Sequence, residues 1–176
     1  IATPSNIVRP ESWLLGSSGN SAVEAGRRGA GYSFAQFFNG QLSKEILDAY
    51  KNNFEASPFM EKPEINVSYM VTAAETAEEA EFQAGPQDIW RLQFMKGHSG
   101  QVLTPEEAQD FPLTEMDRMQ IQEGRKLHLV GSAEEIAERL QQEQSQYGFD
   151  EAMICSIPHS QEARLNVYKL LARELF

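Results

Sequence analysis

The segment from residue 13 to residue 29, WLLGSSGNSAVEAGRRG, decides how the chain folds. It opens with three apolar residues, and a loop of small and polar residues, Gly16 to Ser21, follows them. Residues that favour a helix then run from Ala22 to Gly29, and glycine is the residue that most often ends a helix. The segment therefore predicts a strand, a tight loop and a helix in that order.

The same alternation returns along the rest of the chain. Further apolar runs that predict strands lie at 32–38, 65–72, 127–131 and 152–157. Helix signals follow these runs, and they include capping boxes at Thr76 and Ser132. No hairpin dipeptide joins neighbouring strands. We predict from these signals an α/β fold of four βα units with a parallel sheet.

The stretch from residue 85 to residue 125 has a weaker pattern than its surroundings. It contains a short amphipathic piece near Ile89, a glycine-bounded loop at 97–100 and a helix start at 104–107. We predict that it is an irregular insertion within a single domain that spans residues 1–176.

Periodicity leaves two architectures open. Four βα units are half of an eight-stranded βα-barrel of the TIM type, which takes about 250 residues as a rule. A doubly wound four-stranded sheet would satisfy the same pattern.

Composition excludes several classes of protein. The 176 residues carry 15 Lys and Arg against 26 Asp and Glu, a formal net charge of −11. This acidic balance argues against nucleic-acid binding and against attraction to a membrane surface. No apolar run approaches the ~20 residues of a membrane span, and the single cysteine, Cys155, cannot form an intrachain disulfide. We expect a cytoplasmic protein.

The loop from Gly16 to Ser21, called the serine loop below, is the strongest candidate for a ligand site. Small residues between a strand and a helix start expose backbone N–H groups beside the positive end of the helix dipole, an arrangement that binds phosphate. The spacing matches neither GxxxxGK[ST] nor GxGxxG nor GxSxG. The alternative is that these residues only form a turn and an N-cap.

Other reactive side chains carry weaker signals. The histidines, His98, His128 and His159, are scattered without the spacing of metal ligands, so we expect no metal site. His128 lies in an apolar run and is expected to be structural, whereas His98 and His159 lie in loops. Cys155 falls on a buried strand and is expected to be inert.

The residues at 10–22 and 29–38 resemble the middle of the bacterial luciferase-like flavin monooxygenases, and the segments at 129–136 and 150–154 resemble the last βα units of that family. The resemblance implies an eight-stranded βα-barrel that binds reduced flavin mononucleotide (FMN) and uses O₂ to oxidise a small organic substrate. The matching part is the C-terminal half of the barrel, strands five to eight.

The resemblance also implies roles for particular residues. It assigns the flavin phosphate to four positions of the serine loop: Gly16, Ser17, Ser18 and Ser21. It places Phe34 and Gln36 beside the flavin or the substrate. The family's catalytic segment lies in the first half of the barrel and has no counterpart here, so no catalytic residue is assigned.

We therefore expect a fragment of a longer monooxygenase that is inactive alone. An isolated half-barrel exposes apolar edges, so it should pair with the missing N-terminal half or form a homo-oligomer. Two alternatives stay open, a non-catalytic flavin-binding protein of the same fold and a half-barrel whose loop binds nothing.

Overall fold

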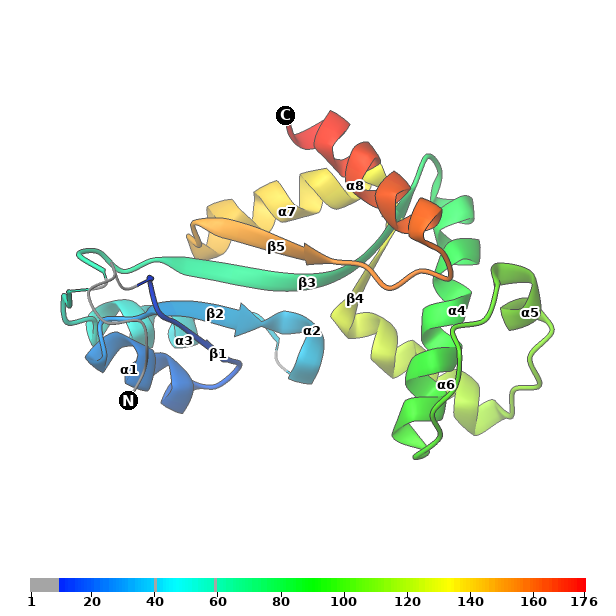
Figure 1. The fold of residues 1–176 in the computed structure, drawn as a ribbon, viewed down its shortest axis with the longest axis horizontal. Helices are drawn as coiled ribbons and strands as arrows, with labels where there is room; N and C mark the ends of the chain where they lie inside the picture. The colour runs from blue at the N-terminus through cyan, green and yellow to red at the C-terminus, as the bar shows by residue number, and fades with distance from the viewer. Residues whose placement is uncertain (1–9, 40, 59) are drawn as a thin grey trace. The chain divides into compact units, whose positions relative to one another are not determined.

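The computed structural model describes residues 10–39, 41–58 and 60–176, and it shows strands that alternate with helices (Figure 1). The elements are β1 (Trp13–Gly16), α1 (Gly19–Arg27), β2 (Gly31–Ala35), α2 (Gln36–Asn39), α3 (Lys44–Asn52), β3 (Ile65–Ala74), α4 (Ala77–Met95), α5 (Pro105–Gln109), α6 (Glu115–Gly124), η1 (Arg125–Leu127), β4 (His128–Ser132), α7 (Ala133–Tyr147), β5 (Glu151–Cys155) and α8 (Gln161–Leu175).

The chain divides into two compact units. Unit 1 consists of the described residues up to Ser68 together with Tyr147–Ala152, and unit 2 consists of Tyr69–Gln146 and Met153–Phe176. The division falls within β3, so this strand contributes its first residues to unit 1 and its last residues to unit 2. The prediction that residues 1–176 form a single domain stays a prediction.

In unit 1 the strands are parallel. β1 pairs with β2 in the register Leu14↔Tyr32, and β2 pairs with the start of β3 in the register Tyr32↔Ile65. The start of β5 is joined to β3 by Asp150, whose backbone N–H donates to Ile65 O at 2.8 Å and whose carboxylate accepts from Ile65 N at 2.8 Å.

Helices α1 and α3 cover one face of β2. The Tyr32 ring stacks on the Tyr50 ring of α3 at a centroid distance of 5.6 Å. The two helices pack closely at Gly26, where an added Cβ would lie 2.7 Å from Tyr50 O. Because side chains alternate along a strand, Ser33 points away from this layer. It lies there with Asn66, to which it donates a hydrogen bond at 2.5 Å.

Unit 2 contains the end of β3 and the strand β4, which run parallel in the register Met70↔His128. Helix α7 is tied to β3 by Tyr69, whose hydroxyl donates to Glu143 Oε2 at 2.7 Å. Helix α4 is held to the η1 turn by Arg125, whose Nε donates to both carboxylate oxygens of Asp88 at 2.8 Å. No helix within the described ranges is long and apolar enough to cross a membrane.

The predicted parallel α/β organisation is confirmed, with two differences in detail. The strand predicted at 32–38 ends at Ala35, and Gln36 begins the short helix α2. A turn is also expected at Asn39–Gly40, and Gly40 lies outside the described residues. Each of the five predicted apolar runs contains a strand in the described part of the chain, so the count of four βα units is one too low. β4 and β5 both pair with the ten-residue β3.

The segment 85–125 is largely helical rather than irregular. Helix α4 continues through Pro86 to Met95, although proline in a helix interior costs about 3 kcal/mol. Packing offsets this cost, since the helix buries Ala84, Ile89 and Leu92 on both sides of the proline. Capping boxes at Thr104 and Thr114 then start α5 and α6.

Candidate functional site

The serine loop lies in unit 1, at the carboxyl end of β1. Gly16 is the last residue of β1, and α1 begins at Gly19. Ser18 is the N-cap residue of α1 and has the extended backbone that this position requires, with φ −132° and ψ 158°. The predicted order of strand, loop and helix is thus confirmed.

Ser18 and Ser21 form a reciprocal capping box. Ser18 Oγ accepts from the backbone N–H of Ser21 at 3.3 Å, and Ser21 Oγ accepts from the backbone N–H of Ser18 at 3.2 Å. Ser21 Oγ also donates to Ser18 O at 2.8 Å. A hydroxyl has one proton, so Ser21 has no second proton to offer to a ligand while this bond is made.

A buried tyrosine, Tyr32, forms hydrogen bonds with two residues of the loop. Tyr32 Oη lies 3.0 Å from Ser21 Oγ and donates to Ser18 O at 3.2 Å. Burial raises the pKa of Tyr32, which keeps its hydroxyl protonated. Gly16 is also needed here, because an added Cβ would overlap the Ser21 side chain. The contact of Tyr32 with the loop depends on the strand register, so no local pattern in the sequence indicates it.

The amino end of α1 is electrostatically unusual. The first turn of α1 holds no acidic residue, a feature that it shares with the four-residue helix α2, whereas the first turns of α3 to α8 each hold at least one. The positive end of the α1 dipole is therefore not compensated by a carboxylate of its own helix. The N–H groups of Gly19 and Asn20, the first two residues of α1, have no intrahelical acceptor.

The remaining positions of the loop leave room for a ligand. Ser18 is exposed and Ser17 is half-buried. An added Cβ at Gly19 would meet no atom within 4 Å. Two hydroxyls and two backbone N–H groups thus lie at a positive helix end with open space beside Gly19, a donor set that fits the phosphate group of FMN. The assignment of Gly16, Ser17, Ser18 and Ser21 to a flavin phosphate stays a prediction.

The two residues assigned to the flavin or substrate pocket differ in their surroundings. Phe34 is fully buried and packs edge-on against Tyr32 at 6.4 Å, which gives it a role in the core of unit 1. Gln36 is only 5% exposed, and its buried Oε1 has no hydrogen-bond partner among the described residues. Buried polar atoms are rarely left unpaired, so Gln36 is the better candidate of the two. The pocket itself stays a prediction.

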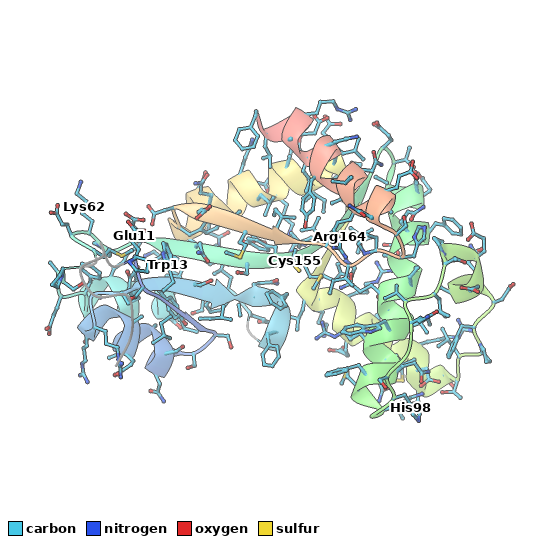
Figure 2. The ribbon with its side chains drawn as sticks, viewed as in Figure 1. Glu11, Trp13, Lys62, His98, Cys155 and Arg164 are labelled. Atoms are coloured by element: carbon cyan, nitrogen blue, oxygen red, sulfur yellow. The ribbon has the colours of Figure 1, made fainter. Side chains whose placement is uncertain are left out.

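The other reactive side chains belong to unit 2, whereas the serine loop belongs to unit 1. Exposed His98 accepts or donates one hydrogen bond with Gln93, and half-buried Cys155 ends β5; Figure 2 labels both. His128 lies inside unit 2, 2.9 Å from Thr72 Oγ1, and burial lowers its pKa to about 3. Over the described ranges, no three His, Cys, Asp or Glu side chains gather into a possible metal site.

Known proteins match nearly the whole chain. The family model described as luciferase-like monooxygenase matches residues 1–151. The Bacillus subtilis (strain 168) protein YceB is 35% identical over 95% of this chain and 50% of its own length. A luciferase-like monooxygenase of Escherichia coli (strain K12) is 28% identical over 90% of this chain and 47% of its own length.

The solved structures agree with the sequence comparisons. The crystal structure of apo-MsnO8 matches 98% of this chain and 52% of that chain, with 27% identity and a TM-score of 0.83. Solved neighbours are monooxygenases with the TIM-barrel fold, and this chain covers about half of them. Of the two architectures that the sequence pattern left open, the half-barrel rather than the doubly wound sheet is therefore confirmed. The chain spans about half the length of the curated relatives that it matches.

Proposed function

The chain belongs to the luciferase-like monooxygenase family, and from this premise we propose that it is the C-terminal half of an FMN-dependent monooxygenase whose serine loop binds the flavin phosphate. The proposal depends chiefly on one observation, the amino end of α1 with free N–H groups, serine hydroxyls and no carboxylate in its first turn. Proteins of the family bind FMN.

Each residue of the serine loop has a distinct task in this proposal. Ser17 and Ser18 donate their hydroxyl protons to phosphate oxygens, and the N–H groups of Gly19 and Asn20 donate to the same group. Ser21 acts indirectly, because its hydroxyl proton is used within the loop to hold Ser18 in place. Gly16 allows the close approach of Ser21.

Bound FMN in its reduced form supplies the reaction with O₂, and the protein supplies orientation and a site that excludes water. On this chain, Gln36 follows the carboxyl end of β2, and active sites of barrel enzymes lie at that end of the strands. We assign Gln36 to the substrate pocket, whereas Phe34 packs against Tyr32 in the core of unit 1. The unpaired Oε1 of Gln36 supports its assignment, since a substrate or flavin N–H would supply the missing donor.

The proposal includes partners. A small organic molecule is the substrate, and the remaining N-terminal half of the barrel supplies the catalytic residues, so the 176-residue chain is inactive alone. Relatives about twice as long support this division. We further propose a cytoplasmic bacterial protein that assembles into homo-oligomers.

A titration of FMN against the 176-residue chain tests the phosphate site. Flavin fluorescence is the readout, and riboflavin, which lacks the phosphate, is the control ligand. Ser17→Ala removes one hydrogen bond to a charged group, worth ~1.5–3 kcal/mol, so the dissociation constant for FMN should rise about 10- to 100-fold. Ser145→Ala, a serine exposed on α7, is the matched control and should change nothing.

Two results would contradict the proposal. One is riboflavin binding as tightly as FMN, and the other is unchanged FMN binding in Ser17→Ala. If the chain alone binds no flavin, the titration is repeated with the complete barrel, and absence of phosphate-dependent binding there rejects the site. Turnover of the complete barrel with a flavin reductase and O₂ then separates a monooxygenase from a flavin-binding protein without activity.

A further inference from the structure

Unit 2 contains a cavity of about 810 Å³ that the serine loop does not explain. Its walls are the end of β3, the first turns of α4, the loop that follows β5 and the first turns of α8. Ligand pockets commonly have volumes of ~300–1,000 Å³. The cavity is therefore large enough for a small organic molecule.

Two polar atoms in the walls of this cavity have no partner. Gln83 Oε1 and His159 Nδ1 are both buried and make no hydrogen bond to any described residue. Such atoms are rare in folded proteins because they lose water without gaining a substitute. Both atoms belong to residues that line the cavity, so a ligand held there is the group that would supply the missing partners.

The charges around the cavity disfavour an anion. Glu79 and Glu162 line it, and each lies in the first turn of its own helix, α4 or α8, where its carboxylate compensates the positive helix end. Lys169 is the one lysine or arginine in the lining of this cavity, so the formal charge of its side chains is −1 with His159 neutral. A phosphate or carboxylate ligand would face two carboxylates.

We propose that this cavity binds a small neutral molecule that carries an amide group. The amide N–H donates to Gln83 Oε1, and the amide carbonyl accepts from His159 in the tautomer that carries its proton on Nδ1. A single amide thus carries both the donor and the acceptor that the two unpaired atoms lack. Every residue that this site needs lies in unit 2 and none is in the serine loop, so the proposal does not depend on flavin binding.

The test uses benzamide, methyl benzoate and benzoate as matched probes against the ¹⁵N-labelled 176-residue chain, followed by NMR. Benzamide carries the amide, methyl benzoate lacks the N–H donor and benzoate is an anion. Benzamide should shift the side-chain amide signal of Gln83 and the ring signals of His159. Methyl benzoate and benzoate should each bind at least tenfold more weakly than benzamide.

Two variants complete the test. Gln83→Leu removes the acceptor and should weaken benzamide binding at least tenfold, whereas Gln141→Leu, a matched change at an exposed position of α7, should leave it unchanged. The proposal is overturned if methyl benzoate binds as well as benzamide, or if saturating benzamide leaves the Gln83 and His159 signals of the unmodified chain in place. The second result needs no variant and so holds even if Gln83→Leu does not fold.

Discussion

Replacing Tyr50 by phenylalanine removes one oxygen atom from the core of unit 1. The Tyr50 side chain is fully buried, and its hydroxyl donates to Ala30 O at 2.9 Å and accepts from Glu64 N at 3.1 Å. The ring keeps its place in Tyr50→Phe, because it stacks on Tyr32 and packs edge-on against Phe54 at 5.9 Å. The change therefore isolates the two hydrogen bonds.

The two bonds contribute unequally. Glu64 is an exposed residue, so in the variant a water molecule replaces the Tyr50 hydroxyl as the acceptor for the Glu64 N–H. Ala30 is 7% exposed, and its carbonyl loses a partner in a place that water does not reach. A buried polar group left unpaired costs ~1–3 kcal/mol, so we expect Tyr50→Phe to lower the free energy of unfolding by about 2 kcal/mol. In a chain of this size that lowers Tm by about 4–8 °C.

The measurement is urea unfolding followed by tryptophan fluorescence. The chain has two tryptophans, Trp13 in unit 1 and Trp90 in unit 2. A Trp90→Phe background makes Trp13 the sole reporter, so the transition of unit 1 is observed separately. Tyr168→Phe, at an exposed position of α8, is the control and should change stability by less than about 0.5 kcal/mol.

The pH dependence gives an independent check. Burial raises the pKa of Tyr50 to about 12 from an ordinary value of 10. The stability that the protonated hydroxyl contributes is thus complete below pH 10 and is lost as the pH rises from 10 through 12. The difference between the unmodified chain and Tyr50→Phe should narrow over that range. A loss below about 0.5 kcal/mol at pH 7, or a difference that stays constant up to pH 12, would refute the role given to this hydroxyl.

Two further predictions concern packing and a buried histidine. Gly31→Ala places a Cβ against the indole ring of Trp13, which Figure 2 labels, so it should destabilise unit 1 by ~1–3 kcal/mol in thermal melts. Gly19→Ala is the control and should not destabilise unit 1, because its added Cβ meets no atom within 4 Å. Burial lowers the pKa of His128 from 6.5 to about 3, so its ring NMR signals should not titrate between pH 8 and pH 5. The stability that neutral His128 contributes is complete above pH 6.5 and is lost as the pH falls from 6.5 toward 3. Over that range the urea midpoint should fall less steeply with pH in His128→Gln than in the unmodified chain. Equal slopes would contradict the buried, neutral state assigned to His128.

Local signals predicted most of the elements because apolar period and capping residues act within a few positions. Thr76 precedes α4 as predicted, and β3 starts at Ile65, the first residue of the predicted run 65–72. The expectation of an irregular segment from residue 85 was wrong, because α4 runs on to Met95. Gly85 and Pro86 weaken a helix locally, and burial against the rest of unit 2 carries the helix past them. Packing between segments that are distant in the sequence cannot be predicted from a short stretch of residues.

The candidate site was predictable in position but not in detail. The small residues between 16 and 21 indicated a loop at a helix start, and the structure has that loop. The contact of Tyr32 with Ser21 depends on the pairing of β1 with β2, which no single strand reveals. The cavity in unit 2 was also not predicted, because it joins Gln83 to His159 across 76 positions of the sequence.

The serine loop separates residues that the fold needs from residues that only a ligand would need. Gly16 and Ser21 are explained by folding, because the Ser21 side chain fills the space over Gly16 and holds the N-cap. Ser18 is explained by folding as well, since it caps α1. Ser17 makes no hydrogen bond with the described residues that would give it such a task. A loss of FMN affinity in Ser17→Ala without loss of stability would therefore assign the loop to a ligand, whereas Ser18→Ala would change both quantities and distinguish nothing.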